Sequence, residues 1–194
     1  MQKFFVKKCK EVKEMKCYIN VLFLIVLISN YVSADQRFYV WTYEYKIIER
    51  GEAEIESYFT LSSPDKNNIK GNVDVEHQLE LEIGMTERFD FSIYQIFSQK
   101  KGKELNYKGF KLRGRYKIGE KGKYFLDPLI YFEYKGNSDL SKSGIEFKLI
   151  LAKDIGKFNI SLNPYIEIEK EGEWEYEPKY AIGMSYEISE LLRF

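Results

Sequence analysis

Two rows of charged side chains are the first feature of this 194-residue sequence that could do chemistry. In residues 72–83 acidic side chains occupy alternate positions, and the acidic row consists of Asp74, Glu76, Glu80 and Glu82. In residues 110–118 the same spacing gives a basic row of Lys111, Arg113, Arg115 and Lys117. Opposed carboxylates and cations can close on each other as ion pairs, or line a pore and bias ion passage. Both rows are therefore candidates for the lining of a lumen.

Hydrolytic chemistry would need a nucleophile within reach of a base, and the single histidine of the chain is His77. His77 shares the apolar parity of its stretch, where a lipid-facing hydrolase could place a base. The residue two positions along is Leu79 rather than serine, and Ser92 in the next stretch has the polar parity. A tolerated polar residue near an interface or a protein contact explains His77 more simply. We therefore expect no enzyme activity and assign no catalytic residue.

Metal and cofactor sites have little support in the sequence. Rows of carboxylates offer oxygen ligands for calcium or magnesium, but such sites usually cluster in glycine-containing loops. Cys9 and Cys17 both precede residue 35, and a single histidine leaves zinc or copper without a ligand set. The stretch 119–122 reads as a hairpin turn rather than a phosphate-binding loop, because no helical pattern follows it. We expect no metal and no cofactor.

A period-two alternation of apolar and polar residues positions these side chains. It indicates strands with one apolar and one polar face. From Gly51 onward we predict eight strands, at residues 53–61, 72–83, 88–98, 110–118, 124–134, 145–151, 158–169 and 174–188. Long loops and short turns alternate between them, the loops at 62–71, 99–109, 135–144 and from 171, the turns at 85–87, 119–122 and 154–156. Such strands and connections are typical of transmembrane β-barrels.

The first 34 residues read as an export signal. They hold six lysines against two glutamates, then an apolar run at residues 21–28 and a small-residue site that ends at Ala34. We predict cleavage after Ala34; an uncleaved anchor is the alternative, although the run is short for a span of about 20 residues. Residues 35–50 form an N-terminal segment (an arm, a plug or an extra strand), and residues 51–194 form the barrel domain. The chain after residue 34 is acidic, which excludes the basic footprint of a nucleic-acid-binding protein.

The expected fold is all-β: a transmembrane antiparallel up-and-down β-barrel of about eight strands, or part of a larger barrel of about 10–12 strands. In either form the apolar parity faces lipid and the charged rows face the lumen. An eight-stranded barrel is just filled by side chains, which favours internal ion pairs, whereas a wider barrel would hold a pore. A soluble carrier with an apolar interior has the same alternation with the faces reversed. Strand length and the abundance of aromatic residues favour the membrane form.

The sequence also resembles bacterial outer-membrane β-barrels, including uncharacterised porin-like and transporter-like families. The resemblance is carried by WTYEY at 41–45, RGEAEIE at 50–56 and LEIGMTERFDFSIYQ at 81–95. The resemblance implies a location in the outer membrane and identifies no catalytic residues. The aromatic Phe194 resembles the signal that barrel assembly machinery reads, although residues 188–194 also read as a turn into a further strand.

The predicted function is porin-like or transporter-like passage of small solutes across the bacterial outer membrane. A closed structural or adhesive barrel is the alternative, and a membrane lipid hydrolase is a third and weaker reading. The expected partners are outer-membrane lipid, the assembly machinery and lipopolysaccharide. Lipopolysaccharide would meet the lysines of the 99–109 loop on the outside, namely Lys100, Lys101, Lys103 and Lys108.

Overall fold

The computed structural model of the chain describes residues 39, 42–64, 73–189 and 192–193. The predicted signal peptide at residues 1–34, the loop residues 65–72 and the terminal Phe194 lie outside the described residues. Within the described part of the chain, no helix is both long enough and apolar enough to cross a membrane.

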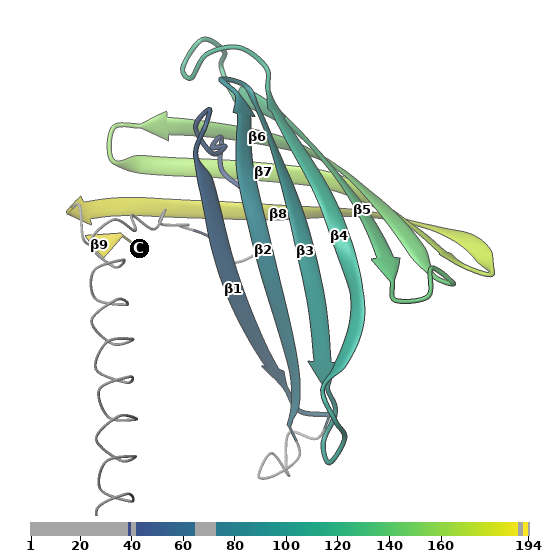
Figure 1. Cartoon of the computed structure of the whole chain (residues 1–194). Helices are drawn as coiled ribbons and strands as arrows, with labels where there is room; N and C mark the ends of the chain where they lie inside the picture. Colours follow the sequence, from purple (N-terminus) through teal and green to yellow (C-terminus); the bar gives the residue numbers. More distant parts are fainter. Residues whose placement is uncertain (1–38, 40–41, 65–72, 190–191, 194) are drawn as a thin grey trace, which may run out of the picture. The chain divides into compact units, whose positions relative to one another are not determined.

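The described chain forms one sheet in which each strand is hydrogen-bonded to the next strand in sequence (Figure 1). Every neighbouring pair is antiparallel. The strands are β1 (Ala53–Ser62), β2 (Asp74–Thr86), β3 (Phe89–Gln99), β4 (Asn106–Lys117), β5 (Asp127–Asn137), β6 (Ser143–Ile155), β7 (Phe158–Glu171), β8 (Glu173–Ser189) and β9 (Leu192–Arg193). The all-β class and the up-and-down antiparallel order predicted from the alternation are confirmed.

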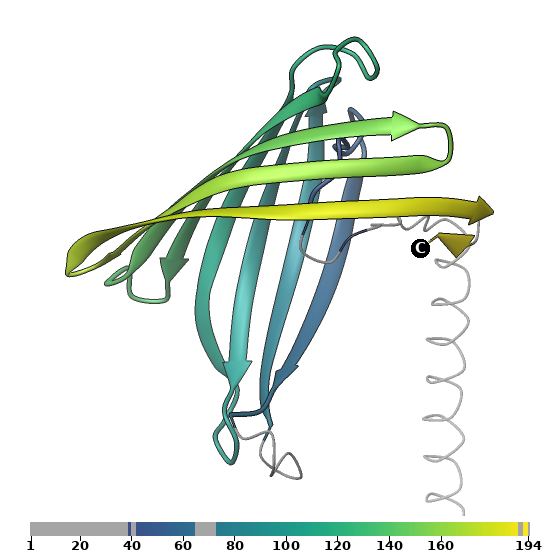
Figure 2. The same ribbon diagram turned by 180° about the vertical axis from the view of Figure 1, so that it is seen from behind.

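The sheet curls, so that it has a concave and a convex face (Figures 1 and 2). Among the described residues, β1 pairs with β2, and β8 pairs with β7 and with the two-residue β9. The described sheet is therefore a half-barrel with β1 at one edge and the long β8 near the other.

The alternation of long and short connections predicted from the sequence is wrong at two places. Residues 118–126 form a loop between β4 and β5, because positive-φ glycines turn the backbone twice and Asp127 accepts the Gly122 amide at 2.8 Å. Conversely, β7 and β8 meet at Gly172 alone, whose φ of 89° permits a tight turn in place of a long loop. The predicted 99–109 loop is also shorter than expected, because β4 begins at Asn106.

The two faces of the sheet carry opposite chemistry. Along β6, Glu146 and Lys148 are buried, whereas Phe147 between them is 50% exposed. Along β8, Ser185 is buried and the flanking Met184 and Tyr186 are exposed. The side chains on the concave face are therefore polar and buried, and those on the convex face are apolar and exposed, as the alternation predicts.

Residues 42–50, which we call the inner segment, lie on the concave face without forming a strand. Side chains of β7 hold its backbone: Asn163 Oδ1 accepts the Tyr43 amide at 2.6 Å, and Ser161 Oγ donates to the Tyr43 carbonyl. Further along, Asp90 Oδ2 accepts the Ile48 amide at 3.1 Å. The inner segment is thus bound by side chains rather than by a strand ladder.

A small apolar core lies between the inner segment and the sheet. Its members are Tyr45 and Ile47 from the inner segment, together with Leu129, Tyr131, Ile150 and Ala152 from β5 and β6. Leu129 and Ile150 have no exposed surface. Burial of such side chains stabilises a fold by about 1.5–3 kcal/mol each. The inner segment therefore shields the apolar positions of an otherwise polar concave face.

The inner segment enters β1 through a close passage at Gly84. The Gly51 amide donates to the Gly84 carbonyl, and the Gly84 amide donates to the Glu52 carbonyl, both at 2.9 Å. A β-carbon on residue 84 would overlap the Glu49 carbonyl oxygen. Only glycine fits here without displacement of the backbone.

We predict that Gly84→Ala displaces the inner segment and lowers the free energy of unfolding by about 1–3 kcal/mol, as overpacking does. Trypsin should then cut faster after Lys46. Gly144→Ala is the matched control, because a β-carbon there has 3.5 Å to its nearest neighbour. Urea unfolding and timed proteolysis measure both effects. Equal behaviour of the two variants would contradict the close passage.

Candidate functional site

A group of buried charges occupies the concave face where β2, β3 and β4 lie side by side. Glu82, Ser92 and Arg113 are register partners across these three strands. Because Ser92 is small, the Arg113 guanidinium extends over β3, donates to Ser92 Oγ at 2.7 Å and also donates to Glu82. Arg113 Nη2 lies 2.8 Å from Glu80 Oε1 as well. We refer to the following residues as the central ion cluster: Glu80, Glu82, Asp90, Arg113 and Arg115.

Arg115 extends the central ion cluster one row further along β4. Its Nη2 lies 2.9 Å from Glu82 Oε2, and its Nε donates to the two Asp90 oxygens at 3.0 and 3.1 Å. The cluster is buried throughout, with Arg113 and Glu80 both 0% exposed. Charges so far from water are tolerated only when they are paired and hydrogen-bonded. The cluster therefore fills the middle of the concave face with ion pairs.

A second group of charges lies over β5, β6 and β7. The Lys148 ammonium is 2.9 Å from Glu146 Oε1. It also lies over three aromatic rings, at 4.6–4.7 Å from the centroids of Tyr43, Tyr131 and Tyr165. Aromatic faces attract cations electrostatically. Because Tyr43 belongs to the inner segment, this group ties the inner segment to the sheet.

The structure brings together four of the eight residues in the two predicted rows. The residues that meet in the central ion cluster are Glu80, Glu82, Arg113 and Arg115. Lys111 instead lies 3.5 Å from Glu133 on β5, and Lys117 lies 5.7 Å from the ring centroid of Tyr45.

The other two acidic residues lie near the connection between β3 and β4, away from the central ion cluster. Asp74 Oδ1 accepts the Lys101 amide at 3.0 Å, and Glu76 pairs with Lys108 at 2.8 Å. Both acids are half-buried. Their partners are lysines that the sequence suggested for lipopolysaccharide, so Lys108 is engaged within the chain.

Sequence reasoning missed several members of the site. Asp90 and Tyr94 on β3 belong to it, and Tyr94 Oη accepts a hydrogen bond from Arg113. Glu133 and Lys148 on the next strands also belong to the buried charges. All of them lie on the polar parity of a predicted strand. The parity was therefore the available signal, and the register between strands was the missing information.

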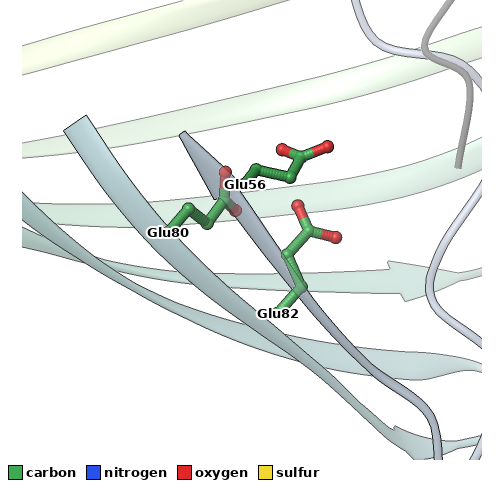
Figure 3. Close-up of side chains that lie close together, drawn as sticks. All are labelled: Glu56, Glu80 and Glu82. Atoms are coloured by element: carbon green, nitrogen blue, oxygen red, sulfur yellow. The ribbon is translucent and has the colours of Figure 1, made fainter. Parts of the chain in front are cut away.

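Three carboxylates gather at one side of the central ion cluster, Glu56 from β1 and the neighbouring Glu80 and Glu82 from β2 (Figure 3). One oxygen from each lies within 4.8 Å of the others. Arg113 contacts Glu80 and Glu82, and Arg115 contacts Glu82. Cationic charge is thus already supplied by two guanidinium groups. We interpret the three carboxylates as part of an ion-paired interior.

Two hollows flank the filled middle of the concave face. One, of about 350 Å³, lies near the connections 100–105 and 138–142, and its lining includes Glu76, Lys108, Lys111 and Lys135. The other, of about 340 Å³, lies near the turn 156–157, and its lining includes Lys117, Lys121, Asp127 and Asp154. Along β4, Arg113 and Arg115 of the central ion cluster lie between the two sets of lining residues, and residues 44–46 of the inner segment line the second hollow.

Tyr45 anchors the inner segment beside the second hollow. Its hydroxyl donates to the Gly119 carbonyl at 2.7 Å. Burial raises the pKa of Tyr45 above its ordinary value, and the charges of Asp127 and Glu120 add to this effect. The phenol therefore stays protonated and remains a hydrogen-bond donor over the whole neutral range.

Comparisons with known proteins yielded no match, whether with protein-family models, curated proteins or solved structures. The arguments about function therefore rest on the geometry described above.

We predict that Arg113→Met lowers the free energy of unfolding by about 3–5 kcal/mol, because it leaves buried carboxylates without their cation. Arg88→Met is the matched control. Arg88 lies 2.7 Å from Glu120, but the two side chains are 46% and 76% exposed, so its loss should cost far less than the loss of Arg113. Urea unfolding monitored by tryptophan fluorescence measures both values. Similar costs for the two arginines would refute the role of the central ion cluster.

Proposed function

We propose that this chain is an outer-membrane β-barrel protein that passes small solutes and is held closed by its inner segment. The observation that carries the proposal is that the convex face is apolar and exposed, whereas the concave face is charged and buried. Large apolar side chains on the convex parity are exposed, among them Phe147, Tyr176 and Ile182. Charged side chains on the concave parity are buried. A soluble protein arranges these classes the other way round, whereas a barrel in lipid requires this arrangement.

Strand length supports a membrane-spanning barrel. The eight long strands range from 10 residues in β1 to 17 in β8. A tilted strand needs about 9–11 residues to cross the hydrocarbon core. Each of these strands is therefore long enough to span an outer membrane.

The edges of the sheet must also be satisfied in a bilayer. Unpaired backbone groups in hydrocarbon cost several kcal/mol each, so open sheet edges do not persist there. The edges at β1 and β8 must then pair with each other, which gives an eight-stranded barrel, or with additional strands, which gives a larger one. Both forms place the central ion cluster inside the lumen.

The arrangement on the concave face supports a solute path that is closed but able to open. Hollows lie toward both ends of the strands, the central ion cluster lies between them along β4, and the inner segment lines one of them. The inner segment is held by side-chain hydrogen bonds, among them those of Ser161 and Asn163 to Tyr43, and by the packing of Tyr45 and Ile47, but not by strand pairing. Displacement of the inner segment would therefore leave the strand ladder intact. A permanently closed structural barrel is the second candidate, favoured by the filled middle of the concave face.

We predict that Leu149→Arg, in the middle of β6, destabilises the protein in lipid vesicles by about 2–4 kcal/mol, since the arginine would face hydrocarbon. Leu149 is 39% exposed, so in water the same change should alter stability by only about 0.5 kcal/mol. Leu105→Arg in the loop 100–105 is the control, at 57% exposure. Urea unfolding of vesicle-inserted protein measures the difference. A harmless Leu149→Arg would reject membrane insertion of this face.

We predict that the double variant Ser161→Ala with Asn163→Ala conducts in a planar bilayer more often than the unaltered protein. Each lost hydrogen bond is worth about 1 kcal/mol, so the open fraction should rise roughly ten- to hundred-fold. The current should favour cations, because the central ion cluster holds three carboxylates and two guanidinium groups.

The matched control for conductance is Asn137→Ala with Ser141→Ala. These two side chains bond each other at 2.9 Å in the connection between β5 and β6, away from the inner segment. The control should behave as the unaltered protein does. A folded Ser161→Ala/Asn163→Ala variant that stays silent would favour the permanently closed barrel over solute passage.

A further inference from the structure

The convex face carries one polar pair among its apolar side chains. Ser57 on β1 and His77 on β2 share the outward parity, and Ser57 Oγ lies 2.9 Å from His77 Nε2. His77 is the register partner of Phe59, and Ser57 is the partner of Leu79, so the two polar residues are diagonal neighbours. The sequence pattern pointed to no serine near His77, because Leu79 lies two positions along β2 and Ser92 on β3 has the polar parity. The structure corrects this expectation: the serine comes from β1.

The contact joins a nucleophile to a base. When the histidine proton is on Nδ1, Nε2 accepts the hydrogen bond from the Ser57 hydroxyl. That is the arrangement in which histidine can remove the serine proton as the oxygen attacks an ester carbonyl. The distance lies within the range that general-base catalysis requires, about 2.6–3.2 Å.

Aromatic side chains fix the plane of the histidine ring. The Phe59 ring stacks on the imidazole at 4.2 Å between centroids, with 4° between the planes. Phe97 lies on the β3 side, at 6.3 Å. The two rings limit rotation of the imidazole and make the surroundings of the pair apolar. An apolar site of this kind can accept acyl chains beside the nucleophile.

The pair also has a definite depth in the sheet. β1 ends at Ser62 and β2 begins at Asp74, so Ser57 and His77 lie three to five residues from the same end of the strands. At about 3.3 Å per residue, this is roughly 10–17 Å along the strand. For strands tilted by about 45° in a bilayer, the pair therefore lies roughly 7–12 Å below that end of the strands, where it faces acyl chains rather than water.

We propose that Ser57 and His77 form a catalytic pair that hydrolyses acyl esters of membrane lipids. The lipid class of the substrate rests on the proposed membrane location; the pair itself does not. Ser57 Oγ attacks the carbonyl carbon while His77 Nε2 takes the hydroxyl proton and then gives it to the departing alcohol oxygen. The acyl group is then bound to Ser57. Water attacks this ester, His77 accepts the water proton, and Ser57 Oγ leaves with that proton as the fatty acid departs.

The test uses the full chain, folded in detergent micelles, and a fluorophosphonate probe that reacts with activated serines. We expect labelling at Ser57, located by mass spectrometry, and its loss in Ser57→Ala. His77→Gln keeps a hydrogen-bonding group but lacks a base, so it should lower the labelling rate by about 10²–10⁴-fold. Ser143→Ala removes another outward-parity serine, at the start of β6, and should change nothing. A folded protein that is not labelled at Ser57 overturns the proposal.

Substrate class is tested with phosphatidylethanolamine in mixed micelles and with a water-soluble butyrate ester. Release of fatty acid from the phospholipid, lost in Ser57→Ala and unaffected in Ser143→Ala, supports the proposal. Cleavage of the soluble ester alone would overturn the assignment of a lipid substrate.

The labelling and ester-cleavage results can be distinguished from the results of the conductance and vesicle experiments. A protein that conducts but carries no label retains the proposed transport function and loses the catalytic pair. A labelled protein in which Leu149→Arg is harmless in vesicles retains the reactive pair and loses the membrane substrate.

Discussion

The constraint on which the rest of the structure depends is the burial of two arginines on the concave face. Arg113 and Arg115 have almost no access to water, so each needs carboxylate partners at hydrogen-bond distance. Glu80 and Glu82 come from β2, two strands away from β4, whereas Asp90 comes from the adjacent β3. The distance is bridged because the intervening position on β3 is Ser92, whose side chain leaves room for the guanidinium and also accepts a hydrogen bond from it. A bulky residue at this position would separate the charges.

The need to shield buried side chains from water also explains the position of the inner segment. A curled sheet of this kind leaves apolar side chains such as Leu129 and Ile150 on its concave face beside the charges. The inner segment covers them with Tyr45 and Ile47, and it brings Tyr43 over the Lys148 ammonium. Aromatic rings can meet both needs at once, because they are apolar in bulk and attract cations at their faces. The inner segment thus joins the apolar and the charged parts of the interior.

Much of this fold could be predicted from the sequence because period-two alternation reports on each strand separately. The parity of β6, with Glu146 inward and Phe147 outward, needed no knowledge of any other strand. The connections were less predictable, since residues 124–126 continue the alternation although the backbone is still turning. The inner segment also alternates, but its amides are bonded to the side chains of Asp90 and Asn163 rather than to a partner strand. Alternation alone does not distinguish these two ways of satisfying a backbone.

The contacts between strands could not be predicted from the sequence, because they depend on the register between strands. Ser57 lies beside His77 only in the register that pairs Ser57 with Leu79. At the other end of these strands, the hydrogen bonds of Gly51 and Glu52 to Gly84 fix that register. A slip by one residue would carry Ser57 to the concave face and Glu56 to the convex face. The close passage at Gly84 therefore sets both the carboxylates that face inward and the serine that faces outward. The interior charges and the exterior pair are independent in chemistry, but they depend on the same strand register.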